Sequence, residues 1–174
     1  MSLIRKINEI LQKIAKFLTF LGGLMLIVMM LITTADVILR TFFGSTIQGA
    51  SVIVRNLLIV AMFLGLPYVT FTKGHTRSEV IYARGSARVK MILDILAYGI
   101  GAVLFFLMSY SLIGPVMKAF ATNQFDSEGT FMMSLAPFYV LSLFGAIFSL
   151  YAALYNFVVM LMDAVRNRKG AEQK

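Results

Sequence analysis

The chain has 174 residues, of which 59% are hydrophobic and 14% are charged, whereas soluble domains have about 45–50% and about 25%. Its formal charge of +8 could suggest nucleic acid binding, but the basic residues flank long apolar stretches, which is typical of membrane topology and not of a nucleic acid partner. The absence of cysteine excludes disulfides, thiolate metal sites and a cysteine nucleophile.

The first predicted element is an amphipathic helix over residues 3–16. Its apolar residues recur every three or four positions, and Lys and other polar residues occupy the positions between them. The apolar positions are Ile4, Ile7, Leu11, Ile14 and Leu18. We expect this helix to lie at the cytoplasmic membrane interface.

Four apolar stretches are each long enough for a membrane span, which needs about 20 mostly apolar residues. The first contains nineteen uncharged residues after Lys16, more than the apolar region of a secretory signal, so we predict a retained span. The fourth is predicted to begin near Pro137, a residue tolerated in the first turn of a helix. The expected spans are residues 17–42, 50–72, 88–117 and 136–162, followed by a cytoplasmic tail over 163–174, all in one membrane domain covering 1–174.

Charge predicts the orientation of these spans. Thirteen of the sixteen Lys and Arg residues lie at the two chain ends or between the second and third spans. The opposite side has Arg40, Arg55 and Lys118, together with Asp126 and Glu128. The positive-inside bias therefore places both termini in the cytoplasm, with a multi-pass chain in the inner membrane of a bacterium.

An enzyme is not expected. His75 is the sole histidine, so the chain cannot supply a bis-histidine haem site, and no phosphate-binding loop or catalytic triad is recognisable. We predict no cofactor and no metal. Pro67 and Pro115 could bend their helices, but no paired broken helices of the kind that build a solute site are evident.

Asp36 and Arg40 are four residues apart and should lie on one helix face, where pairing lowers the cost of a charge in low dielectric. They could belong to an ion or proton path, or form a structural pair that anchors the helix end or binds a partner subunit, which we favour. Arg55 could join them as a second cation around Asp36, or extend to a lipid phosphate.

Several short segments, in order, resemble the small membrane subunit, DctQ type, of tripartite ATP-independent periplasmic (TRAP) transporters. They are Asp36-Val-Ile-Leu-Arg40-Thr-Phe-Phe-Gly, Gly49-Ala50 with Arg55, Phe63-Leu64-Gly65, and Gly74-His75-Thr-Arg-Ser-Glu79-Val. The last resembles the family's G-H-x-x-x-D segment, with Glu in place of Asp. The chain departs from the family before Arg55, where members often carry glutamate and this sequence has Ser51-Val52-Ile53.

The resemblance implies a fixed scaffold that packs against a larger multi-span permease, while a periplasmic binding protein delivers the solute. It also implies sodium-coupled uptake of an organic anion, a carboxylate or sulfonate. Candidate scaffold or subunit-interface residues are Asp36, Arg40, Arg55, His75 and Glu79. Asp126 and Glu128 are candidates for docking on the periplasmic side.

His75 and Glu79 share a face if their segment is helical. They could fasten the second span to the large subunit or to a lipid headgroup, or cap a turn.

The sequence thus predicts an all-α integral membrane protein, with four transmembrane helices plus an N-terminal interfacial amphipathic helix, in contact with lipids. One alternative is a self-assembling four-helix structural or pore-forming membrane protein. A second is the anchor subunit of a membrane oxidoreductase, which the lack of paired histidines disfavours.

Overall fold

The computed structural model describes residues 2–72 and 87–171, with side chains over residues 8–72 and 93–162. The described part consists of four helices and one hairpin: α1 (Ser2–Phe43), α2 (Ala50–Phe71), α4 (Ala87–Ala121), β1 (Phe125–Glu128), β2 (Phe131–Ser134) and α5 (Ala136–Ala171). Each of the four helices is long and apolar enough to cross a membrane, which confirms the predicted four-span, all-α architecture.

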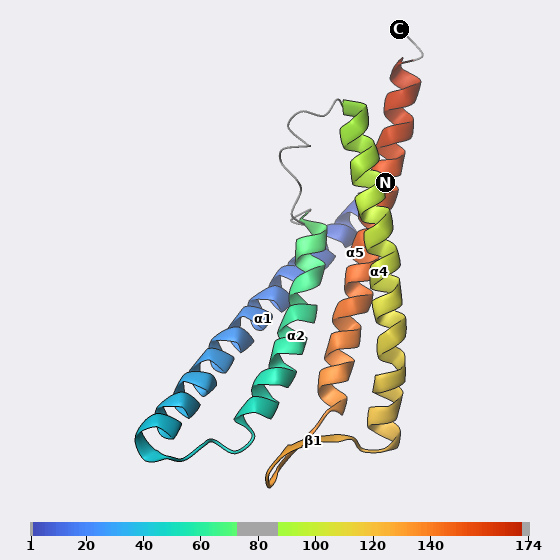
Figure 1. The fold of residues 1–174 in the computed structure, drawn as a ribbon. Helices are drawn as coiled ribbons and strands as arrows, with labels where there is room; N and C mark the ends of the chain where they lie inside the picture. Colours follow the sequence, from blue (N-terminus) through green and yellow to red (C-terminus); the bar gives the residue numbers. More distant parts are fainter. Residues whose placement is uncertain (1, 73–86, 172–174) are drawn as a thin grey trace.

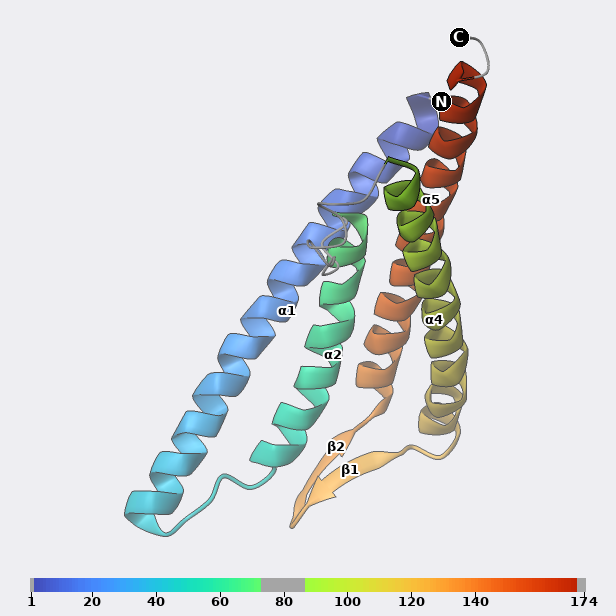
Figure 2. The same cartoon turned by 45° about the horizontal axis from the view of Figure 1, so that its top comes forward.

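The helices form a row in the order α1, α2, α5, α4 (Figures 1 and 2). The two central helices, α2 and α5, are more buried than the outer helices α1 and α4. Along the helix axes, the hairpin and the α1–α2 loop lie together at one end of the molecule, here called the loop side. The start of α1 and the end of α5 lie at the other end (Figure 1).

The face of α1 that packs against α2 is marked by residues that are not exposed and that recur at a regular spacing. Between Gly22 and Arg40, the positions of α1 that are not exposed are spaced alternately by three and four residues. They are Gly22, Met25, Met29, Ile32, Asp36 and Leu39. An average spacing of 3.5 keeps one seam against a partner helix, as in a coiled coil. Gly22 allows close approach, because a Cβ there would lie 3.0 Å from the carbonyl oxygen of Ala61.

The structure does not support a separate N-terminal interfacial helix over residues 3–16. Helix α1 runs without interruption from Ser2 to Phe43. Leu11 packs against the cluster of Ala15, Phe71 and Ala152, so part of the apolar stripe is used for contact with neighbouring helices. With no proline or loop signal between Leu3 and the first span, the chain has no cause to break there.

The contact between α2 and α5 is close and contains polar residues at regular spacing. A Cβ on Gly145 would lie 2.4 Å from the carbonyl oxygen of Phe63. Ser142, Ser149 and Asn156, seven residues apart, are all buried in α5. The two hydroxyls donate to carbonyls four residues earlier in their own helix, and Asn156 donates to Thr70 O at 2.7 Å. These groups are therefore satisfied without water, as a membrane interior requires.

The β-hairpin between α4 and α5 was not predicted. Its strands pair antiparallel, with Phe125 opposite Ser134 and Glu128 opposite Phe131. Three residues connect α4 to β1 and one residue connects β2 to α5. The Leu135 amide donates to Gln124 O at 3.0 Å and closes the base of the hairpin. The hairpin is consequently attached to the α4–α5 pair by short connections.

Candidate functional site

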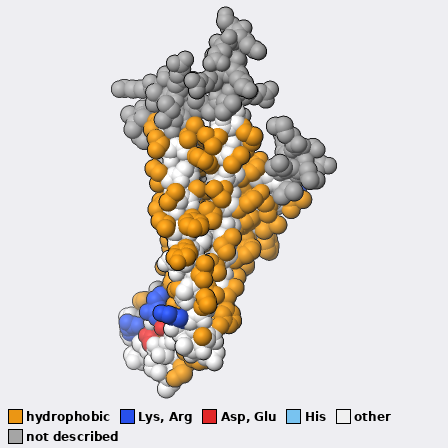
Figure 3. Space-filling model, turned by 90° about the vertical axis from the view of Figure 1, so that its right-hand side faces the viewer, with side chains coloured by type: hydrophobic (Ala, Val, Ile, Leu, Met, Phe, Trp, Pro, Cys, Tyr) orange, Lys and Arg blue, Asp and Glu red, His pale blue; other side chains and the backbone are white. Residues whose placement is uncertain are grey.

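Four hydrogen bonds between side chains at least 70 residues apart lie at the loop side. Figure 3 shows basic and acidic side chains together at this end, below a hydrophobic surface. The described charged residues at this end are Asp36, Arg40, Arg55, Lys118, Asp126 and Glu128. Their contacts fall into two groups, one at the α1–α2 loop and one at the junction of α2 with the hairpin.

Asp36 fixes the loop that follows α1. One carboxylate oxygen accepts from Arg40 at 2.9 Å, as expected from the four-residue spacing, and the other accepts from the backbone amide of Ile47 at 2.8 Å. The side chain of Asp36 is 13% exposed, whereas that of Arg40 is 67% exposed. Asp36 therefore connects Arg40 with the loop that follows α1.

Asp126 joins the hairpin to the second turn of α2. Its Oδ2 accepts from Arg55 Nη2 and from Asn56 Nδ2, the latter at 2.9 Å. Asn56 is buried, and its amide also donates to Val52 O in the preceding turn. The hydrogen bond from Arg55, followed by that from Asn56, holds the pKa of Asp126 below its ordinary value. Asp126 is thus a carboxylate that two neighbouring residues of α2 stabilise in its ionised form.

Three further contacts extend this junction toward the tip of the hairpin. Ser51 donates to Glu128 at 2.6 Å, and Thr130 donates to Gln48 Oε1 at 2.6 Å. The Phe131 ring packs directly over Gly49, where a Cβ would lie 2.2 Å from the ring.

Asp126, Glu128 and Phe131 lie on one face of the hairpin, since directly opposite residues of an antiparallel pair share a face. That face is turned toward α2. The other face carries Phe125 and Met132, which are 58% and 69% exposed.

Of the two alternatives for Arg55, contact with Asp36 or with a lipid phosphate, the contact with Asp36 is not found. Arg55 pairs with Asp126, 71 residues later in the chain. No local spacing in the sequence identified Asp126 as the partner of Arg55.

We expect the hairpin to stay attached to α2 above about pH 4 and to loosen in more acidic solution. The folded-state pKa of Asp126 is lowered relative to an ordinary value of about 3.9. The stabilisation is therefore fully present above that value and is lost as the pH falls through the folded-state pKa. A spin label at Met132, introduced as Met132→Cys in this cysteine-free chain, should become more mobile below about pH 4.

Asp126→Asn is the control for this titration, because it removes the carboxylate to which the change is assigned. In that variant the label should already be mobile at pH 7, with little further change on acidification. An acid transition of unchanged size in Asp126→Asn would contradict the assignment to this carboxylate.

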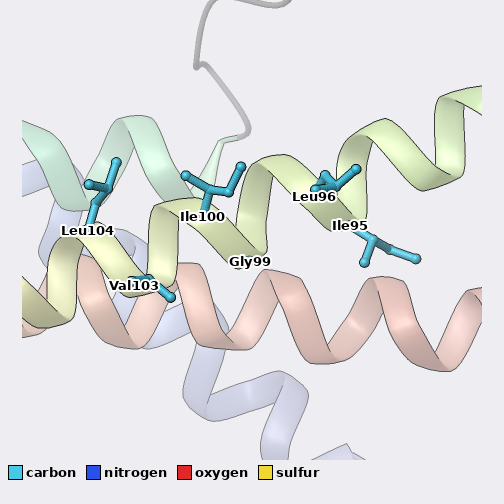
Figure 4. A pocket seen from close by; sticks show the side chains of 6 residues that line it. All are labelled: Ile95, Leu96, Gly99, Ile100, Val103 and Leu104. Carbon is cyan, nitrogen blue, oxygen red and sulfur yellow. The ribbon is translucent and has the colours of Figure 1, made fainter.

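The chemistry available elsewhere in the described part is limited. An open groove of about 400 Å³ runs along α4 and is lined by Ile95, Leu96, Gly99, Ile100, Val103 and Leu104 (Figure 4). Its lining is apolar and suits a hydrocarbon chain or an apolar helix rather than a polar solute. Among the described residues, no group of three or more His, Asp or Glu could hold a metal ion. His75 and Glu79 lie outside the described residues.

Comparison with known proteins identifies the class and then the family. The four apolar helices define a multi-pass membrane protein. Residues 29–162 match the family described as tripartite ATP-independent periplasmic transporters, DctQ component. Comparisons with curated proteins and with solved structures give no match.

Because the match covers most of the chain, the protein belongs to the DctQ family and is the small permease subunit of a TRAP transporter in the inner membrane. Members of this family are non-enzymatic transporter components that work with a large permease subunit and a periplasmic binding protein.

Proposed function

We propose that the chain is a fixed scaffold for the large permease subunit during sodium-coupled uptake of an organic anion. The solute, a carboxylate or sulfonate, would be delivered by the periplasmic binding protein. The observation that carries the scaffold role is the distribution of polar contacts. Long-range hydrogen bonds join α2 to the hairpin and to α5, while the outer helices α1 and α4 keep broad apolar faces for a partner or lipid.

The orientation follows from charge. With both termini in the cytoplasm, the side that carries thirteen of the sixteen basic residues faces inward. The α1–α2 loop and the hairpin then lie at the periplasmic surface, where the binding protein arrives. Helix α1 crosses the membrane and continues toward the cytoplasm, because its 42 residues span about 63 Å, about twice the hydrocarbon thickness.

The candidate residues divide into two groups within this proposal. The scaffold residues act at both ends of α2. Asp36, Arg40 and Arg55 stabilise the periplasmic ends of α1 and α2, and His75 and Glu79 would fasten the cytoplasmic end of α2 to the large subunit or a lipid headgroup.

The docking residues lie on the hairpin. Glu128 is exposed and contributes to docking of the binding protein, whereas Asp126 contributes indirectly, by holding the hairpin in place.

Isolation of the tagged chain from its native membrane in mild detergent, followed by mass spectrometry, tests the scaffold role. We expect stoichiometric recovery of one much larger multi-span permease. Recovery of the chain with copies of itself alone would overturn the proposal and favour the self-assembling four-helix protein.

Transport in liposomes tests the coupling ion and the division of labour. The two membrane subunits together with the binding protein should accumulate a labelled organic anion under an inward sodium gradient and not under a matched potassium gradient. The small subunit alone should accumulate none. Uptake by the small subunit alone would refute the scaffold role, whereas equal uptake in potassium would refute sodium coupling only.

A further inference from the structure

The hairpin takes the place of a helix partner for the start of α2. Val52, Asn56, Val60 and Leu64 are buried in α2 and are spaced by four residues, so they form one row on its surface. Farther along α2, Phe63 and Thr70 contact Gly145 and Asn156 of α5. At its start, Asn56 contacts Asp126, and strand β1 packs against α2.

Each side of this junction is held together by its own contacts. The hairpin is attached to α4 and α5 by short connections and by the Leu135–Gln124 backbone hydrogen bond. Helix α2 is held to α1 along the seam that includes Gly22, and the intervening loop is held by Asp36. On the loop side, the hairpin therefore joins two helix pairs, α1–α2 and α4–α5, that are each already tied together.

The contacts across the junction are polar side-chain bonds and one ring contact. They are Arg55 and Asn56 with Asp126, Ser51 with Glu128, Gln48 with Thr130, and Gly49 with Phe131. Asp126 makes two of them through a single oxygen. By contrast, the α2–α5 contact at Gly145 is backbone against backbone and cannot be released by changing one side chain.

We propose that the hairpin is a releasable strap, and that the part of α2 before Phe63 moves away from the α4–α5 pair when the carboxylate of Asp126 is lost, while the Phe63–Gly145 and Thr70–Asn156 contacts stay closed. The strap sets the separation of the two pairs on the loop side, and the opposite end keeps its spacing through Asn156 and Thr70. This inference concerns the chain itself and does not depend on the transported solute or on the coupling ion.

Paired spin labels in the isolated complex test the strap, since the chain has no native cysteine. The loop-side pair is Leu58→Cys with Phe120→Cys, at side chains 43% and 62% exposed on α2 and α4. The pair for the opposite end is Thr72→Cys with Leu96→Cys. The cysteine-free chain, carried through the same labelling in the complex, gives the background from other subunits.

In Asp126→Asn, the loop-side distance distribution should broaden and shift to longer distances, while the opposite pair should stay unchanged. Lys118→Gln, a charge change at the end of α4 outside the junction contacts, is the matched control and should leave both pairs unchanged. If Asp126→Asn does not fold, Arg55→Gln carries the test: it removes one of the two side-chain bonds to Asp126 and should lengthen the loop-side distance by a smaller amount, with the opposite pair unchanged. An unchanged loop-side distance in a folded variant, or an equal change at both ends, would overturn the strap.

Discussion

Replacing Gly145 by valine should destabilise the chain more than any other single change considered above. A Cβ at this position would lie 2.4 Å from the carbonyl oxygen and 2.7 Å from the carbonyl carbon of Phe63. Both atoms belong to the backbone of α2, so relief requires the helices to separate. Overpacking a tight contact costs about 1–3 kcal/mol and sometimes more, and we expect the upper end of that range in the free energy of unfolding in detergent.

Gly101→Val is the matched control for this change. Gly101 is also a glycine within a membrane-spanning helix, but a Cβ there would meet nothing within 4 Å. Thermal unfolding of the purified complex should show a much lower melting temperature for Gly145→Val and a nearly unchanged one for Gly101→Val. Equal melting temperatures for the two variants would show that the α2–α5 contact is looser than described.

The second large effect is expected from Gly49→Ala, which combines backbone strain with a collision. Gly49 has φ +81°, and its Cβ would lie 2.2 Å from the Phe131 ring. A left-handed conformation costs a non-glycine residue about 1–2 kcal/mol, and displacement of the ring adds to that cost. The loss of unfolding free energy should therefore exceed the cost of strain alone.

Two variants separate these contributions. Gly44 also has a positive φ, +61°, but has open space around its Cβ, so Gly44→Ala should show the strain without the collision. Adding Phe131→Ala to Gly49→Ala should recover part of the loss by removing the ring. If Gly44→Ala and Gly49→Ala are equally destabilised in thermal unfolding, the packing of Phe131 on Gly49 contributes nothing.

The parts of this fold that could be predicted depend on local patterns. Each span is visible as an apolar stretch of sufficient length, and the Asp36–Arg40 pair follows from a four-residue spacing on one helix. The extent of the amphipathic segment could not be predicted in the same way, because the same apolar spacing occurs in a helix lying on a membrane and in a helix packed against another helix. The contact of Leu11 with the Ala15–Phe71–Ala152 cluster is visible only in three dimensions.

The hairpin and its attachment could not be predicted for a different physical reason. Its strands are four residues each, and β1 reads Phe-Asp-Ser-Glu, a polar sequence with little strand propensity. The contacts that hold it, Arg55 with Asp126 and Ser51 with Glu128, join residues 71 and 77 positions apart. A single sequence gives the charges of these residues but not which of them meet.

The seam of α1 determines more than which helix it contacts. Sliding α1 by seven residues would keep the same spacing of sheltered positions but would bring Ala15 or Met29 to the place where Gly22 approaches Ala61. It would also move the Asp36 carboxylate along the axis by about 10 Å, away from the Ile47 amide. The glycine and the aspartate, fourteen residues apart, thus select one register. The roughly 21 Å of helix between them sets the depth at which the chain turns back toward α2.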